Sequence, residues 1–149
     1  MRYYDGWDDY YMEMAELVAT RSGCLSRQVG CVLVKDNNVL ATGYNSTIPG
    51  MLPCKERGFC LREGCASGTE LQNCFAIHAE QSVLSKCAKL GVSCYDATLY
   101  LTTQPCSTCL KMLIQAGVKK ILYRDPYPDE LSQIIADRAN IEMRQFTRK

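Results

Sequence analysis

The chain has 149 residues, of which 47% are hydrophobic, with 17 basic and 16 acidic side chains. This length suits one domain with a real core, so we expect a single domain over residues 1–149. The near-neutral charge, without a Lys/Arg-rich run, argues against a nucleic-acid or membrane partner and favours a small-molecule ligand. No apolar stretch approaches the ~20 residues that span a bilayer, and the N-terminal residues do not read as a signal peptide. We therefore expect a cytoplasmic protein.

Hydrophobic spacing predicts helices alternating with strands. The expected elements are a helix over 7–21, strands over 29–34 and 39–44 joined by a turn, a helix over 77–90 ended by Gly91, a strand over 97–102, a helix over 106–116 followed by Gly117, a strand over 120–123, a helix over 131–138 and a strand over 141–146. Such alternation predicts one sheet covered by helices, a three-layer α/β sandwich.

The stretch from 45 to 73 has no periodicity, and it is rich in cysteine. Loops beyond about 12–15 residues without regular structure are uncommon in compact domains and are usually functional or disordered. This loop holds Cys54, Cys60 and Cys65 and ends at Cys74, four of the ten cysteines in the chain. In a cytosolic protein, clustered cysteines are better interpreted as metal ligands or buried apolar residues than as disulfides.

Two short motifs supply one imidazole, one carboxylate and two thiols. His78, the only histidine, is followed two residues later by Glu80, and Cys106 and Cys109 follow Pro105 downstream. A zinc ion that activates water needs three protein ligands and one open position, and the imidazole with the two thiolates provides that count. Glu80 is then free to move protons.

The spacing within each motif predicts where the metal lies. Residues two apart on a helix point to different sides, so His78 and Glu80 can address one ion only from a helix entrance. Cys106 and Cys109 are three apart and just after a proline, as expected at the start of a second helix. The alternatives are a purely structural zinc, or a buried histidine near two inert cysteines.

The order H-x-E followed by P-C-x-x-C is the signature of zinc-dependent nucleobase deaminases. The sequence resembles the cytidine deaminase superfamily and, within it, the deoxycytidylate (dCMP) deaminases. The resemblance extends over most of the chain, through the segments 20–24, 27–30, 42–45, the two metal motifs, 115–120 and 123–127. It implies an α/β/α sandwich with a central mixed five-stranded sheet, a catalytic zinc on His78, Cys106 and Cys109, and hydrolysis of dCMP to dUMP and ammonia, which feeds thymidylate synthesis.

The same resemblance implies substrate contacts. Asn45 matches an asparagine that contacts the nucleoside, and Tyr127 matches a tyrosine that closes the pocket; a turn residue and a packing tyrosine are the alternatives. Arg27 and Arg124 are the basic residues within the matching segments that could bind the 5′-phosphate.

Relatives of this kind often bind a second, structural zinc, and the matching positions here are Cys24, Cys54, Cys60 and Cys74. Four cysteines close the coordination of zinc, so this site would hold the long loop in place. Cys65 could replace Cys60 or Cys74, and the alternative is a set of reduced, buried thiols. Cys31, Cys87 and Cys94 are expected in the core.

Members of the family are commonly homohexamers, activated by dCTP and inhibited by dTTP at a site that can include Mg²⁺. Here Ser46 stands where a glycine is expected, and a side chain there restricts the approach of the nucleotide phosphates to the backbone, so control by triphosphates stays open. Other substrates stay open, namely dCTP, cytidine, a riboflavin-pathway pyrimidine or a tRNA adenosine, although the neutral charge disfavours tRNA. A zinc-stapled scaffold protein with an inactive deaminase fold is the remaining alternative.

Overall fold

A mixed five-stranded sheet forms the centre of the structure, a computed structural model that describes residues 1–148. The strands lie in the order β2-β1-β5-β6-β7. Their bounds are β1 (Gly30–Lys35), β2 (Asn38–Tyr44), β5 (Thr98–Thr103), β6 (Lys120–Asp125) and β7 (Glu142–Gln145). Strand β1 runs antiparallel to β2 and β5, whereas β5, β6 and β7 are parallel to one another. The expected mixed sheet is confirmed.

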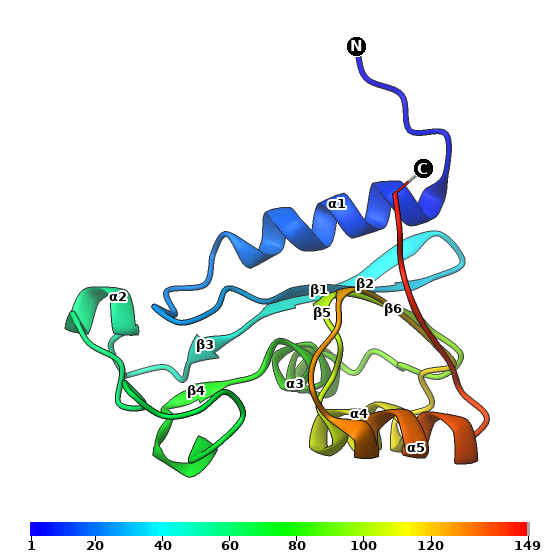
Figure 1. Ribbon diagram of the computed structural model, residues 1–149. Helices are drawn as coiled ribbons and strands as arrows, with labels where there is room; N and C mark the ends of the chain where they lie inside the picture. Colours follow the sequence, from blue (N-terminus) through cyan, green and yellow to red (C-terminus); the bar gives the residue numbers. More distant parts are fainter. Residues whose placement is uncertain (149) are drawn as a thin grey trace.

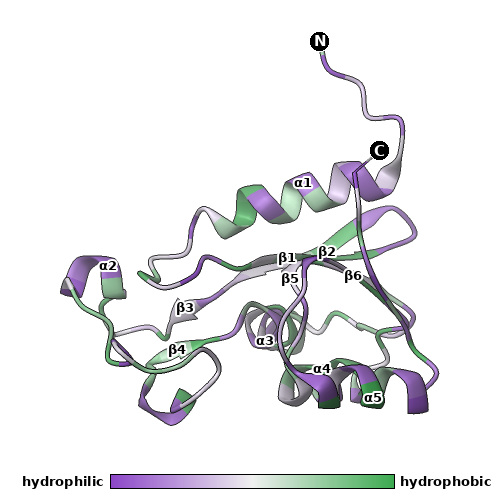
Figure 2. Cartoon of the chain, in the orientation of Figure 1, coloured by the Kyte–Doolittle hydropathy of each residue, from purple (hydrophilic) through white to green (hydrophobic). Residues whose placement is uncertain are grey.

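Helices cover both faces of this sheet (Figure 1). One face carries α1 (Trp7–Ala19), and the other carries α3 (Ala79–Leu90), α4 (Ser107–Gln115) and α5 (Glu130–Arg138). Figure 2 shows hydrophilic and hydrophobic residues along both α1 and α5, as expected for helices that bury one side only. The three-layer α/β/α sandwich is therefore confirmed. Within residues 1–148, no helix is both long and apolar enough to cross a bilayer.

Alternation along the strands divides the core into two halves. Cys31 and Leu33 pack with α3, α4 and α5, while Val32 and Val34 pack with α1. Successive side chains of a strand point to opposite faces of a sheet, so one strand serves both layers. Cys87 and Cys94 are also buried in the half formed by α3, α4 and α5, and the three predicted core cysteines are confirmed.

The segment between β2 and α3 contains only short regular elements. They are β3 (Ser46–Thr47), α2 (Cys54–Arg57), the 3₁₀ turn η1 (Leu71–Asn73) and β4 (Ala76–Ile77). Strands β3 and β4 pair with each other and are separate from the main sheet. Figure 1 shows the whole segment to one side of the layers, beyond the end of α3. The predicted lack of periodicity in this segment agrees with this structure.

Element boundaries differ from the predicted ones by one or two residues, including at two helix entrances. Helix α3 begins at Ala79 and not at Ile77, because Ile77 pairs with Ser46 in the small sheet. Helix α4 begins one residue after Cys106, which is its N-cap. The helix-terminating role of Gly91 is confirmed by its φ of 68°, in the left-handed region.

Gly43 allows β2 to pass close beneath the start of α3. A Cβ atom at this position would lie 2.5 Å from the carbonyl oxygen of Ala79 and 2.8 Å from Cγ2 of Val83. Because only glycine lacks that atom, the sheet and the helix can approach this closely. The close approach brings the first turn of α3 against the sheet.

Candidate active site

His78 lies at the junction between β4 and α3, where it is the N-cap residue of the helix. Its backbone N–H donates a hydrogen bond of 2.8 Å to Oε1 of Gln81, in the first turn of the same helix. This contact satisfies one of the N–H groups left free at a helix entrance and fixes the backbone that carries the imidazole. The predicted placement of His78 at a helix N-terminus is confirmed.

Cys106 and Cys109 come from a second helix entrance. Strand β5 ends at Thr103, Cys106 is the N-cap of α4, and Cys109 is buried in the first turn of that helix. The Sγ atoms of Cys106 and Cys109 lie 3.7 Å and 3.3 Å from Nδ1 of His78. One ligand atom from each of the three residues lies within 4.8 Å of the others. Within residues 1–148, no other group of three potential metal ligands has its ligand atoms this close together.

The geometry of these three donors fits zinc. Bonds of about 2.3 Å to sulfur and about 2.0 Å to nitrogen hold tetrahedral ligand atoms roughly 3.5–4 Å apart. The two N···S distances, 3.3 and 3.7 Å, are close to that spacing, and Nδ1 is the nitrogen that faces both sulfurs. Three ligands leave a fourth position for water, as catalytic zinc sites require.

The two thiols share one negative charge. Hydrogen bonds from Cys109 and His78 lower the pKa of Cys106 to about 4, so this sulfur is a thiolate at neutral pH. The same hydrogen bond between the thiols, together with burial, raises the pKa of Cys109. Contact with Cys106 also raises the pKa of His78. The Cys106 thiolate attracts a divalent cation, and a bound ion would displace the proton of the Cys109 thiol and require a neutral His78 imidazole.

Glu80 lies beside the three donors, in the first turn of α3, and is only 4% exposed. Burial raises the pKa of its carboxyl above the ordinary value, and the backbone N–H at the helix start and the charge of His78 oppose the rise. A raised pKa makes the carboxyl a better proton acceptor than an exposed glutamate, which suits a residue that accepts and returns protons in general acid–base catalysis.

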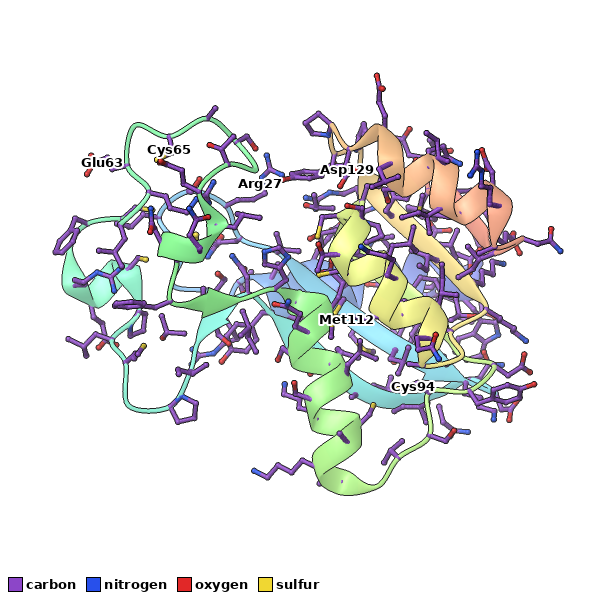
Figure 3. All side chains as sticks on the ribbon, turned by 90° about the horizontal axis from the view of Figure 1, so that it is seen from below. Arg27, Glu63, Cys65, Cys94, Met112 and Asp129 are labelled. Atoms are coloured by element: carbon purple, nitrogen blue, oxygen red, sulfur yellow. The ribbon has the colours of Figure 1, made fainter. Side chains whose placement is uncertain are left out.

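These groups lie in a cleft of about 590 Å³. Its lining includes His78, Glu80 and Cys106 as well as three of the predicted substrate residues, Arg27, Asn45 and Tyr127. Arg27 extends towards the segment that precedes Asp129 (Figure 3), and its guanidinium lies 5.6 Å from the centroid of the Tyr127 ring. A cavity of this size is typical of a small-ligand site.

Asn45 has a further role that its position in the sequence did not reveal. Its Oδ1 accepts a hydrogen bond of 2.9 Å from the N–H of Val29, and its Nδ2 donates one of 2.8 Å to the carbonyl of Arg27. An asparagine amide has two N–H donors and two lone pairs, so one donor and one lone pair stay available for a ligand. Asn45 therefore holds the backbone that carries Arg27.

Arg124, in contrast, is not brought to the cleft. It lies near the end of β6 and pairs with Asp125 at 2.8 Å and with Glu16 of α1 at 3.4 Å. Glu16 belongs to the layer on the opposite face of the sheet from α3 and α4. The structure therefore leaves Arg27 as the predicted phosphate ligand that faces the cleft.

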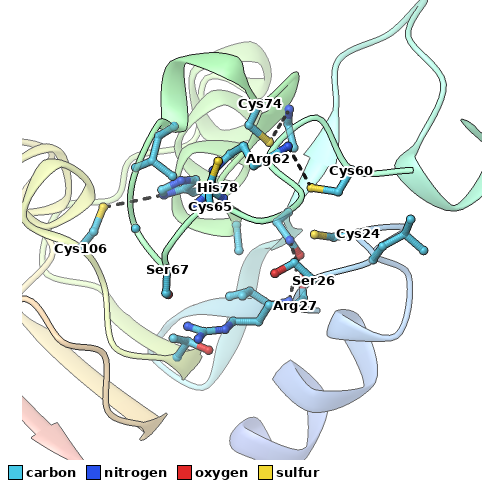
Figure 4. A pocket seen from close by; sticks show the side chains of 18 of the residues that line it. Cys24, Ser26, Arg27, Cys60, Arg62, Cys65, Ser67, Cys74, His78 and Cys106 are labelled. Atoms are coloured by element: carbon cyan, nitrogen blue, oxygen red, sulfur yellow. Dashed lines mark hydrogen bonds between the residues drawn. The ribbon is translucent and has the colours of Figure 1, made fainter. Parts of the chain in front are cut away.

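The four cysteines of the predicted second zinc site lie in the same region, but within residues 1–148 no three of their sulfur atoms all lie within 4.8 Å of one another. Burial raises the pKa of Cys54, and the neighbouring sulfurs of Cys24, Cys60 and Cys74 contribute to the rise. Backbone N–H groups donate to two of these sulfurs, from Arg62 to Cys60 and from Ala76 to Cys74, both at 3.4 Å. Figure 4 shows Cys24, Cys60 and Cys74 on one side of the cleft and Cys106 on the other. Cys65 is separate, because its thiol donates to Glu70 at 2.6 Å.

Three residues with roles in the site were not found from the sequence. Gln81 follows His78 by three residues, and this capping-box spacing was a usable signal. Asp129 accepts from the N–H of Ser107, at the start of α4, and from that of Ser132 in α5. Arg62 lines the cleft from the long loop, and no spacing rule pointed to it.

An imidazole, two thiols and a buried carboxyl, brought together by two helix entrances in an α/β/α sandwich, define a catalytic-type zinc site with an acid–base residue beside it. Comparison with known proteins agrees with this class. Residues 5–124 match the family model described as the cytidine and deoxycytidylate deaminase zinc-binding region. The chain therefore belongs to the cytidine and deoxycytidylate deaminase family.

Individual relatives support this assignment. The chain is 42% identical to the deoxycytidylate deaminase of Schizosaccharomyces pombe and 39% identical to that of Saccharomyces cerevisiae, over 97% and 95% of its length. It spans only 45% of each of these two yeast proteins. The crystal structure of dCMP deaminase from the cyanophage S-TIM5 in complex with dCMP and dUMP is 32% identical, with a TM-score of 0.81 over 97% of this chain and 100% of that one.

Proposed function

We propose that this protein is a hydrolase that converts dCMP and water to dUMP and ammonia. The observation that carries the proposal is the group of His78, Cys106 and Cys109 beside the buried Glu80 at one cleft. The similarity to a phage enzyme whose structure contains dCMP and dUMP supports the choice of substrate. The reaction supplies dUMP for thymidylate synthesis.

His78, Cys106 and Cys109 would hold the zinc ion, which supplies Lewis-acid activation of the attacking water when bound. Glu80 accepts a proton from this water and donates one to ring nitrogen N3 as the oxygen adds to C4. It then takes the second proton of the original water, from the oxygen now bonded to C4, and delivers it to the amino group, which leaves as ammonia while the C4=O bond forms. Burial of Glu80, which raises the pKa of its carboxyl, allows it to alternate between the two protonation states.

The walls of the cleft would position the nucleotide. Tyr127 offers an aromatic face for the base or sugar, and Arg27 offers a cation for the phosphate. Asn45 has one N–H and one lone pair left for a sugar hydroxyl while it holds the Arg27 backbone.

Ammonia release from a panel of dCMP, CMP, deoxycytidine and dCTP tests this function. We expect dCMP to be the best substrate by kcat/KM. A higher kcat/KM for dCTP or deoxycytidine would make that compound the substrate in place of dCMP. Failure to release ammonia from any of the four compounds would favour a non-catalytic scaffold.

Cys24, Cys54, Cys60 and Cys74 are proposed to bind a second, structural zinc. Their proximity and the two backbone N–H···S contacts support it, since hydrogen bonds to sulfur stabilise thiolate ligands. The test is the metal content of the purified protein. Two zinc ions per chain are expected, and one zinc with eight titratable thiols after denaturation would contradict the proposal.

Regulation by triphosphates is also a proposal. Ser46 pairs with Ile77, directly before His78, so a nucleotide with Mg²⁺ near residues 43–46 would contact the strand that enters the catalytic helix. Repeating the ammonia measurements in the presence of dCTP and of dTTP tests this regulation. Activation by dCTP and inhibition by dTTP are the expected results.

We also propose that the protein is a homohexamer with one domain per chain and that it is cytoplasmic. Analytical sedimentation would test the oligomeric state, and cell fractionation would test the compartment.

A further inference from the structure

Two arginines face the cleft from opposite walls without an acidic partner. Within residues 1–148, neither Arg27 nor Arg62 forms an ion pair, whereas Arg124 pairs with two acidic residues. Arg27 comes from the loop between α1 and β1, and Arg62 from the loop between α2 and η1. Unpaired cations that converge on a concave site indicate an anionic ligand.

The loop between α2 and η1 fixes the position of Arg62. The Nε of Arg62 donates a hydrogen bond of 2.8 Å to the carbonyl of Thr69, across the loop. Between these residues, the N–H of Cys65 bonds the carbonyl of Arg62, and the hydroxyl of Thr69 bonds the carbonyl of Ala66. A guanidinium has five N–H donors, so the outer four, on the two Nη atoms, are left to bind a ligand.

Arg62 also lies close to the catalytic group. Both Arg62 and His78 line the cleft. Figure 4 shows Ser26, Arg27, Arg62 and Ser67 around the same opening as His78. Glu63 also borders the cleft, but Figure 3 shows it on the outer side of the loop. The opening near His78 is therefore lined by two cationic side chains and two hydroxyl groups.

We propose that Arg62 is a specificity-determining residue that binds the substrate phosphate opposite Arg27, so that the two arginines select nucleotides over nucleosides. The inference rests on the proposed deaminase function. A guanidinium presents two parallel N–H groups to a phosphate, and a dianionic phosphate matches two arginines in charge. Ser26 and Ser67 add neutral donors at the same opening.

The experiment compares zinc-loaded wild type with Arg62→Gln, using dCMP and deoxycytidine as paired substrates. Loss of a charge-assisted hydrogen bond is expected to raise KM for dCMP by about 10- to 100-fold, with kcat changed by less than about threefold. KM for deoxycytidine is expected to stay the same, and Arg62→Lys is expected to recover part of the affinity for dCMP. Equal increases of KM for both substrates would assign Arg62 a structural role and overturn the proposal, as would unchanged values.

Arg124→Gln is the matched control, because it removes the same charge from an arginine outside the cleft and should leave the ratio of the two KM values unchanged. A binding measurement separates this proposal from the deaminase function. Calorimetric titration of the zinc-loaded protein with deoxyribose 5-phosphate should show weaker binding to Arg62→Gln, whether or not any substrate releases ammonia. Equal affinity of the two proteins for this probe would contradict the role of Arg62.

Discussion

The two walls of the cleft are built in different ways. His78, Glu80, Cys106 and Cys109 belong to the entrances of α3 and α4, whose inner faces pack on the sheet among fully buried residues. The opposite wall, residues 45–75, has only short elements, and its large apolar side chains Phe59, Leu61, Leu71 and Phe75 are each 39–48% exposed. One wall therefore has its geometry from the core, whereas the other depends on local hydrogen bonds and on its cysteines. Substitutions on the two walls should consequently have different effects.

The largest effect is expected for Cys106→Ala. This change removes one of three zinc ligands from the wall supported by the core, so metal content at this site and dCMP turnover should be lost together. The melting temperature should fall to about that of the zinc-free wild type, because the bound ion stabilises the folded state, whereas Cys106 itself lies outside the two core clusters. Metal analysis and ammonia release measure the two losses, and turnover without zinc would contradict the assigned ligand set.

Glu80→Gln separates chemistry from metal binding on the same wall. The amide keeps the shape of the carboxyl but cannot transfer protons, so we expect kcat to fall by about 10²- to 10⁴-fold. Zinc content should equal that of the wild type. Glu56→Gln, at an exposed position of α2, is a control for loss of a carboxylate. Near-normal turnover in Glu80→Gln would remove Glu80 from the mechanism.

Cys54→Ser tests the other wall. Cys54 is the buried member of the four cysteines, so its loss should release the loop and speed proteolytic cleavage within residues 45–75. The catalytic zinc should remain, while turnover falls by about tenfold, because the loop no longer positions its share of the cleft. Cys65→Ser, outside the group of four, should leave proteolysis unchanged. Equal protease resistance in Cys54→Ser and wild type would argue against a cysteine-supported wall.

The smallest effect is expected for Asp129→Ala. The carboxylate caps α5 through Ser132 and bonds the N–H of Ser107, 2.7 Å away, at the start of α4. Loss of such a cap costs about 1 kcal/mol, so urea denaturation should show a decrease of that size in the free energy of unfolding. Asp137→Ala, on the exposed side of α5, should cost less, and an equal cost would mean that capping is not the reason.

Residue patterns in the sequence correctly predicted most of the wall that is built on the core, at the entrances of α3 and α4. There is a physical reason for this. Each of its helices and strands buries one face, so hydrophobic spacing predicts the fold. Pro105 and the ligand spacing indicate the entrance of α4, and Gly91 indicates the end of α3. The loop wall buries little, so no periodicity recorded β3, α2 or β4. Its shape depends on backbone contacts such as that of Arg62 with Thr69, which residue types do not reveal.

Arg124 shows where a pattern was present but was not used. Leu122 faces α1, and residues two apart on a strand share a face, so Arg124 had to point to the α1 side of the sheet. The catalytic groups of the cleft lie at the entrances of α3 and α4, on the other side. Asn45 was assigned by resemblance to a sugar contact, and its two backbone hydrogen bonds, to residues 16 and 18 positions away, could not be predicted locally.

The absent side chain of Gly43 has a consequence for protein engineering. The carbonyl of Ala79, which a Cβ at position 43 would approach to 2.5 Å, lies between the imidazole-bearing and carboxyl-bearing residues in the chain. A methyl group added at position 43 of β2 would displace His78 and Glu80 together, although position 43 does not line the cleft. Directed evolution could therefore alter the catalytic geometry by a substitution at position 43 in the β1–β2 hairpin, without changing any residue that lines the cleft.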